Sequence, residues 1–384
     1  MIRDIVLTLP FFVCFFWSLT LLVDYKKNDR SKNILLLFMS ISALLYAGHA
    51  FYFSMDKKVY TLIDPFYTFS NLAVFPLFLV YIRSLTKEGP LDKRLYWLFA
   101  PSFVFSITSA VVYILLPPDE LSEFVNSFVY GETSGIRFSG LALFQTWVLK
   151  SARIYFALFL VPFAYFSWMY IHQYEKKIRE FYSDTEKRTL IWTGKLLSAV
   201  ILAVVFAMVL NFIGKSFFVH DFTLVIAPSL IFASLLYSIG YLGQKQSFNI
   251  SDYELDSTEP ERGNHHDSSR SKLYEEILLL METKQIFRNP DLRITDVSNL
   301  LKTNRTYVSG IINTEFNSTF CDMVNQYRIE YSKKLLLDRN LYILHYISEE
   351  SGFASVNSFM RAFKKFTGMT PGQFRKQNIT NNNN

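Results

Sequence analysis

The sequence predicts an all-α protein with two parts. A multi-span bundle of apolar helices comes first, and a soluble domain of two helix-turn-helix units joined by a linker helix follows. Three observations predict this. Apolar stretches of about 20 residues recur as far as Leu242, a length that suits membrane-crossing helices. A polar segment comes next. The C-terminal part then repeats one pattern of a short helix, a tight turn and a second helix.

The composition separates the two parts. Of the 384 residues, 17% are aromatic and 38 are Phe. The mean hydropathy is +0.18, too apolar for an ordinary water-soluble surface, and the apolar residues concentrate before Gly243. The net charge of +6 and the pI near 9.0 suit a nucleic acid or an anionic membrane face as partner. Cys14 and Cys321 lie in different parts, so we expect no disulfide, and no CxxC metal pattern is present.

Seven apolar stretches precede the polar segment, and each is near the length that crosses the hydrocarbon core. They are Ile5–Val23, Ile34–Phe53, Leu62–Leu85, Leu95–Leu116, Trp147–Ile171, Leu190–Ile213 and Phe222–Leu242. Several contain proline, which membrane helices tolerate where neighbours satisfy the freed carbonyls. The first stretch lacks a small-residue cleavage site, so we interpret it as an uncleaved span and not as a secretory signal.

Lysine and arginine predict the orientation, because they gather in alternate connections. The basic side holds Lys26, Lys27, Arg30, Lys32, Arg83, Lys87, Lys93, Arg94, Lys176, Lys177, Arg179, Lys187 and Arg188. The other side holds only Arg3, Lys57, Lys58, Arg137, Lys150 and Lys215. Placing the basic side in the cytoplasm predicts a multi-pass protein of the bacterial inner membrane, with its N-terminus outside. Seven spans then leave everything after Leu242 in the cytoplasm.

The polar segment 243–270 has too little apolar surface to fold and is expected to be a flexible linker. His265 and His266 within it have no partner ligands at useful spacing, so we expect no metal site. The soluble domain is predicted over 271–378, with its first helix marked by apolar residues from Leu273 to Ile286. A disordered tail is expected over 379–384.

The first helix-turn-helix copy runs from Ile294 to Asn313 with a break at Lys302–Thr303. Asn304 is a good N-cap for its second helix. Apolar residues at helical spacing predict one small core. They are Val297, Leu300, Leu301, Val308, Ile311 and Ile312.

The second copy runs from Leu344 to about Phe366, and Gly352 suits a turn that needs positive φ. An aromatic stripe follows the turn. It consists of Phe353, Phe359, Phe363 and Phe366. Arg361, Lys364 and Lys365 remain available to solvent or phosphate.

These residues carry a family resemblance. Gly352-Phe353, the run from Phe359 to Lys365, and Thr367-Gly368-Met369-Thr370-Pro371 followed by Phe374-Arg375 are similar, in order and spacing, to the signature of AraC-type transcription regulators. The helix between the copies matches at Asn325, Arg328-Ile329, Ser332 and Leu335-Leu336. The resemblance covers roughly Ser271 to Arg375. Ser298 and Ser348 depart from the usual Ala, and Gly310 stands where members often carry a larger polar side chain.

The resemblance implies that the second helix of each copy enters a major groove of double-stranded DNA. The residues that it assigns to DNA contact are Asn304, Arg305, Thr306, Ser309, Asn313, Ser355, Asn357, Ser358, Arg361, Lys364 and Lys365. Arginine reads guanine and asparagine reads adenine with two hydrogen bonds each, whereas the two lysines suit phosphate. An ordinary solvated face is the alternative for any one of these side chains.

Polar residues inside the apolar stretches are candidates for a ligand site. They are His49, Asp64, Asn71, Arg153 and Asn211. Asp64 and Arg153 fall at similar depth and are able to pair. One hypothesis is a ligand pocket that opens outward, bounded by the mildly acidic connection from Pro117 to Thr146, which has room for a short helix. The alternative is a structural ion pair with interfacial side chains.

No catalytic constellation or nucleotide-binding motif is present, so we predict neither an enzyme nor a cofactor. The leading interpretation is a membrane-embedded, one-component transcription regulator with DNA, the lipid bilayer and an unknown ligand or membrane partner as its partners. RNA polymerase and a second copy of the chain are further expected partners. One alternative is a membrane receptor or transporter whose helical tail binds a protein. Another is a passively tethered regulator that proteolysis releases.

Overall fold

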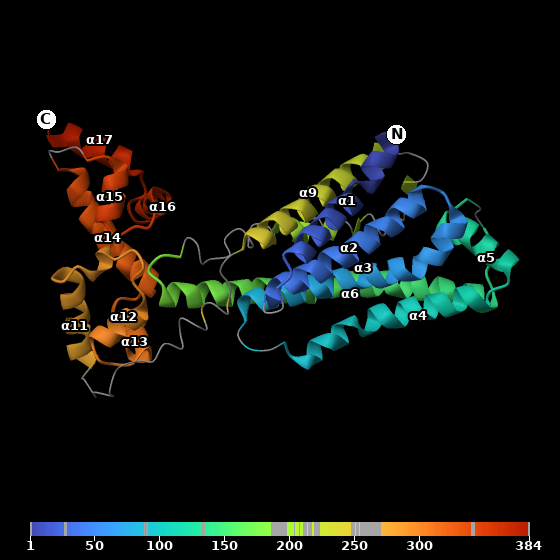
Figure 1. Ribbon diagram of the computed structural model, residues 1–384, viewed down its shortest axis with the longest axis horizontal. Helices are drawn as coiled ribbons and strands as arrows, with labels where there is room; N and C mark the ends of the chain where they lie inside the picture. Colours follow the sequence, from blue (N-terminus) through green and yellow to red (C-terminus); the bar gives the residue numbers. More distant parts are fainter. Residues whose placement is uncertain are drawn as a thin grey trace. The chain divides into compact units, whose positions relative to one another are not determined.

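The computed structural model is helical and contains no β-strand within the residues it describes, which confirms the all-α class (Figure 1). It describes residues 2–26, 29–87, 89, 91–132, 135–185, 198–202, 204–206, 208–209, 213, 217–218, 223–246, 250, 253, 270–338 and 342–382. The chain divides into two compact units. Unit 1 comprises 1–172 and 190–250, and unit 2 comprises 173–189 and 251–384. The sequence placed the division between the two parts at about residue 242. In the structure, residues 173–189 also belong to unit 2.

Unit 1 is built from long helices. They are α1 (Ile2–Val23), α2 (Arg30–Phe53), α3 (Lys57–Thr86), the 3-10 turn η1 (Lys93–Phe99) with α4 (Ala100–Leu115), the first part of α6 (Gly140–Phe181), and α9 (Thr223–Lys245). Six described helices are long and apolar enough to cross a membrane, judged by length and composition. They correspond to six of the seven predicted spans. The other, Leu190–Ile213, lies mostly outside the described residues.

Helix α3 is central to unit 1. In the apolar 18-residue stretch of α3, 72% of the residues are buried, against 22% in the corresponding stretches of α1 and of η1–α4. The helix begins at an N-cap, since the Asp56 carboxylate accepts a hydrogen bond from the Val59 amide at 3.1 Å. Gly48 lets α2 approach α3 closely, because a Cβ at that position would lie 2.8 Å from the Tyr67 ring. The Tyr67 ring therefore packs directly on the α2 backbone at Gly48.

The connection after α4 folds onto the helices. It contains the expected short helix, α5 (Pro118–Phe124), followed by a π-turn, η2 (Val125–Val129). The Tyr52 hydroxyl donates to the Val129 carbonyl at 3.0 Å, and the Tyr130 hydroxyl donates to the Tyr52 carbonyl at 3.2 Å. The two tyrosine rings stack with centroids 4.7 Å apart. The connection is therefore fixed to the end of α2.

Unit 2 contains the two predicted helix-turn-helix copies. Its elements are α11 (Arg270–Glu282), η3 (Ile286–Arg288), α12 (Ile294–Leu300), α13 (Arg305–Glu315), α14 (Phe320–Leu336), α15 (Leu344–Glu350), α16 (Val356–Thr367) and α17 (Pro371–Asn382). Helices α12 and α13 form the first copy, and α15 and α16 form the second. Helix α14 contacts both copies and serves as the linker helix (Figure 1).

The predicted cores are largely present, with two corrections. In the first copy Val297, Val308 and Ile312 are buried, but Leu300 is 54% exposed. In the second copy Phe359 and Phe363 are fully buried, whereas Phe366 is exposed. Its expected place is taken by Phe374 of α17, whose ring centroid lies 5.4 Å from that of Phe363.

Helix α17 extends further than the sequence indicated. The Gln373 side chain accepts a hydrogen bond from the Thr370 amide at 2.9 Å, which caps the start of the helix. The helix then continues to Asn382 and thus overlaps the segment 379–384, which was expected to be a disordered tail. The flexible-linker prediction for 243–270 falls mainly on residues outside the described ranges.

Candidate functional site

The first recognition helix, α13, presents the predicted polar residues on one face. Asn304 is its N-cap, and the Asn304 side chain accepts a hydrogen bond from the Thr306 amide at 2.7 Å. Arg305, Ser309 and Asn313 follow at intervals of four residues, so they share a face of the helix. Asn313 donates to the Ser309 hydroxyl at 3.4 Å. Gly310 is exposed with open space around it, which leaves the backbone beside this face accessible.

The second recognition helix, α16, is more basic. Ser355 is its N-cap and accepts from the Ser358 amide at 3.0 Å. Asn357, Arg361 and Lys364 are exposed and recur at intervals of four and three residues, opposite the buried phenylalanines. No acidic residue lies in this helix. Its exposed face therefore combines hydrogen-bonding and cationic groups, the chemistry that base edges and phosphates require.

Lys365, predicted to meet phosphate, has a partner within the protein. The Lys365 ammonium lies 2.6 Å from the Asp322 carboxylate of α14, and its side chain is 52% exposed. A phosphate would have to compete with Asp322 for this ammonium. Lys364 is thus better placed than Lys365 as a phosphate anchor.

Arg328 of the linker helix joins the parts of unit 2. Its side chain is 1% exposed. The guanidinium donates to the Phe287 and Asn289 carbonyls, each at 2.7 Å, and to the Ser183 hydroxyl at 3.1 Å. Burial lowers the pKa of Arg328 to about 10, so the group is still charged at neutral pH. The sequence marked Arg328 only as a point of resemblance, and the structure shows that it fixes the η3 turn against α14.

The turn of the second copy requires glycine, as predicted. Gly352 has φ +83°, and a Cβ there would lie 2.5 Å from the Phe287 carbonyl oxygen. The Arg288 side chain also donates to the Glu350 carbonyl at 2.9 Å and forms an ion pair with the Glu350 carboxylate. Both contacts join the η3 turn to the second copy, so the Phe287–Asn289 segment meets both α14 and the α15–α16 turn.

The end of α6 completes the first copy, which the sequence did not reveal. The Ser183 amide donates to the Leu292 carbonyl at 3.1 Å, and Tyr182 forms an antiparallel bridge with Arg293. The Cys321 thiol donates to the Ser183 carbonyl at 3.4 Å. Tyr182 is fully buried. The aromatic pair Phe181–Tyr182 after a basic stretch was the available signal, but it lies outside both the family motif and the apolar spans.

The end of α6 also contacts Arg305, a predicted DNA-binding residue. The guanidinium carbon of Arg305 lies 5.8 Å from the centroid of the Phe181 ring, within range of a cation–π interaction. In this arrangement the Arg305 side chain packs against the end of α6. The first recognition helix is therefore in contact with a segment far upstream in the sequence.

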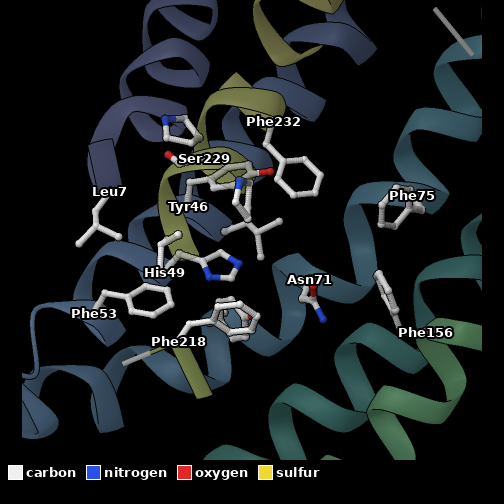
Figure 2. A pocket seen from close by; sticks show the side chains of 15 residues that line it. Leu7, Tyr46, His49, Phe53, Asn71, Phe75, Phe156, Phe218, Ser229 and Phe232 are labelled. Atoms are coloured by element: carbon white, nitrogen blue, oxygen red, sulfur yellow. The ribbon is translucent and has the colours of Figure 1, made fainter. Parts of the chain in front are cut away.

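Unit 1 contains an aromatic-lined cavity of about 180 Å³ among α1, α2, α3, α6 and α9 (Figure 2). His49 and Asn71, two of the predicted ligand residues, line it. The His49 and Tyr67 rings meet edge to face at 5.1 Å. Phe75 and Phe156 lie opposite, with ring centroids 5.5 Å apart. Figure 2 shows the Asn71 side chain between the His49 side and the Phe75–Phe156 side.

A second, smaller cavity of about 70 Å³ shares Tyr67 and Asn71 with the first. Asp64 and Arg153 both line it, but they do not form the ion pair that their depth permitted. The Asp64 carboxylate instead accepts hydrogen bonds from the Tyr60 hydroxyl at 2.5 Å and the Tyr113 hydroxyl at 2.8 Å. Hydroxyls on α3 itself and on the adjacent α4 thus satisfy this carboxylate. Asn211, the fifth predicted residue, lies outside the described residues.

Within the described ranges, no three His, Cys, Asp or Glu side chains gather as a metal ion would require. His265 and His266 lie outside those ranges. The two described cysteines are buried and unbridged.

Residues 297–377 match the family model of a helix-turn-helix domain. The chain is 35% identical over 85 residues to the melibiose operon regulatory protein of Escherichia coli K12, and 34% identical over 91 residues to the Msm operon regulatory protein of Streptococcus mutans. It is 30% identical over 87 residues to the HTH-type transcriptional regulator YtdP of Bacillus subtilis. These relatives are transcription regulators, and the C-terminal region carries a helix-turn-helix domain of the AraC type.

These matches cover only part of the chain. The matches cover 22% to 24% of this chain, and they span 28%, 32% and 11% of the three relatives in the order given. The crystal structure of the C-terminal domain of the response regulator yesN from Fusobacterium nucleatum is 29% identical. It matches over 28% of this chain and 99% of its own, with a TM-score of 0.24.

Proposed function

We propose that the protein is a membrane-embedded, sequence-specific DNA-binding transcription regulator that couples a membrane or outside signal to gene expression. The observation that carries the proposal is the pair of capped helices, α13 and α16. Each presents polar side chains on an exposed face and rests on a buried core. The relatives' names, which describe regulators of operons, support the same assignment for unit 2.

Specific recognition is assigned to both recognition helices. Arg361 and Asn357 of α16 suit guanine and adenine edges, and Arg305 plays the corresponding part on α13. Lys364 suits phosphate and contributes affinity without sequence preference. Two recognition helices joined by one linker helix suit adjacent major-groove segments about one helical turn apart. A second copy of the chain would double the site, and RNA polymerase is the expected partner at the promoter.

The membrane assignment rests on the six apolar helices and on the basic residues between them. Their alternation favours the orientation in which unit 2 lies in the cytoplasm, where DNA is. The cavities of unit 1 are the proposed sensor. Helix α6 supplies Phe156 to the larger cavity and Phe181 to the contact with Arg305. A ligand that favours one arrangement of α6 would thereby shift the DNA-binding state.

The proposal is tested by the salt dependence and sequence dependence of DNA binding by the full chain in nanodiscs. Several phosphate contacts predict that the logarithm of the affinity falls steeply and linearly with the logarithm of the salt concentration. Footprinting should show protection of two neighbouring segments. Lys272→Ala on α11, whose ammonium pairs with Glu276 of the same helix, is the control for Lys364→Ala.

Weak binding with no salt dependence and no footprint would overturn the DNA assignment and favour the alternative, a receptor or transporter whose tail binds a protein. Following the intact length of the protein after stimulation separates direct signalling from release by proteolysis. A shortened, soluble product would favour the passive tether.

A further inference from the structure

We propose that the two cavities of unit 1 form one binding site for a small amphiphilic anion. The ligand has an apolar body of about the size of one aromatic ring and a single anionic group, as in an arylalkanoate or a short-chain carboxylate. The inference deepens the proposed function, since it names the ligand class of the proposed sensor.

The cavities are adjacent parts of one site. Tyr67 and Asn71 line both. Helix α6 also contributes to both, with Arg153 at the smaller cavity and Phe156 at the larger one. Residues three apart on a helix lie on the same face, so these two side chains are neighbours. A ligand with its body beside Phe156 can therefore place its head group near Arg153.

The larger cavity selects an apolar body. Its walls are mainly aromatic and aliphatic, with Tyr46 and Phe232 on one side and Phe75 and Phe156 on another (Figure 2). An apolar cavity of about 150 Å³ accommodates benzene. The volume of about 180 Å³ therefore suits one ring or a short alkyl chain.

The smaller cavity selects an anion. Both oxygens of Asp64 already accept tyrosine hydroxyls, so this carboxylate offers little to a cationic ligand. Arg153 lines the same cavity, and the described residues provide it with neither a hydrogen bond nor an ion pair. An arginine within an apolar membrane helix is costly without a partner, and the Asp64 carboxylate that lines the same cavity bonds to two tyrosine hydroxyls instead. Its planar guanidinium matches a carboxylate with two hydrogen bonds.

The η2 turn gives the smaller cavity a wall that is held in place. Phe128 and Val129 line it, and the Val129 carbonyl accepts the Tyr52 hydroxyl at 3.0 Å. The connection between α4 and α6 therefore borders the site at its polar end. This is the boundary that the sequence hypothesis gave to the pocket.

The test measures binding of 3-phenylpropionate to the full chain in phosphatidylcholine nanodiscs by calorimetry, with 3-phenylpropanamide as the uncharged control ligand. The acid should bind saturably and more tightly than the amide. Arg153→Gln should weaken acid binding by about tenfold to a hundredfold, as expected for a charge-assisted hydrogen-bonded pair, and abolish the preference for the acid. Arg137→Gln, an exposed arginine that lines neither cavity, should leave both ligands unaffected.

Two results would overturn the proposal. One is no saturable binding of either probe, and the other is equal binding of acid and amide. Adding phosphatidylglycerol to the nanodiscs distinguishes the sources of the anion. Competition with the acid would show that an anionic lipid head group occupies the polar end, whereas no competition assigns the site to a free anion. DNA binding is measured separately, so its persistence without ligand binding would refute this inference and leave the proposed function standing.

Discussion

The two helix-turn-helix copies share a pattern but are built differently. The first has an aliphatic core around Val308 and Ile312, and it is completed by residues from the end of α6. The second has an aromatic core around Phe359 and Phe363, closed by Phe374 of α17 from within its own domain. The first recognition helix therefore depends on a segment outside the family motif. The second copy is closed by residues of the C-terminal domain alone.

The largest expected effect comes from removing the buried arginine of the linker helix. Arg328→Met should lower the free energy of unfolding of unit 2 by about 2–6 kcal/mol, because two buried carbonyls lose their donor and each costs about 1–3 kcal/mol. Pulse proteolysis of the full chain in increasing urea measures this change. Lys333→Met, on the same helix but with a partly exposed side chain, should change stability by less than about 0.5 kcal/mol. Equal effects of the two substitutions would show that Arg328 does not hold the η3 turn against α14.

The next effect separates base reading from phosphate anchoring on the second copy. Arg361→Ala should weaken specific DNA binding by about 1–3 kcal/mol and relax the preference at one base pair. Lys364→Ala should weaken binding to all sequences alike and reduce the salt slope by about one. Fluorescence anisotropy with matched and scrambled duplexes distinguishes the two. If Arg361→Ala left the sequence preference intact, the assignment of Arg361 to base reading would be wrong.

A smaller effect is expected on the first copy. Phe181→Ala removes the ring against which Arg305 packs, an interaction of about 0.5–1 kcal/mol. If this contact holds Arg305 away from DNA, the substitution should raise the DNA affinity of the full chain about two- to fivefold. Leu337→Ala, which removes an exposed apolar side chain at the end of α14, is the control and should not raise it. A lower affinity for Phe181→Ala would mean that the contact supports the reading conformation.

The smallest expected effect concerns the Cys321 thiol, which contacts Ser183 just after the end of α6. Burial raises the pKa of Cys321 to about 11 from 9.0, and its thiol donates to the Ser183 carbonyl. In a Cys14→Ala background, iodoacetamide at pH 8 should therefore react with Cys321 far more slowly in the folded protein than in urea. Alkylation at the unfolded rate would show that the end of α6 does not cover this thiol.

The same shift predicts how stability depends on pH. Between pH 9 and pH 11 the unfolded thiol ionises while the folded thiol stays protonated. The contribution of Cys321 to stability is thus fully present below pH 9 and declines as the pH rises through this window. Cys321→Ser should reduce the decline, because serine does not ionise there. Urea denaturation at pH 8 and pH 10 measures the difference.

Local signals in the sequence were sufficient for most of unit 2. Asn304 and Ser355 cap their helices through hydrogen bonds to amides two or three residues away, and Gly352 adopts positive φ within its own turn. Such features depend on neighbours in the chain, so they can be predicted without a fold. Leu300 and Phe366 show the limit. Helical spacing predicted that both side chains lie in the cores. Which face of a helix is buried, however, depends on the helix that packs against it.

The sequence by itself determined the helical class, the apolar spans that it shares with the structure, and the two capped recognition helices, because period, capping and turn chemistry are written in short segments. Tertiary structure alone decided that Asp64 bonds to Tyr60 and Tyr113 instead of Arg153. It also decided that Asn71 lines both cavities. In unit 2 it decided that Ser183 bonds to Leu292 and Arg328. These contacts join residues that are distant in the chain or compete for one partner. Only the packing of whole helices chooses among such partners.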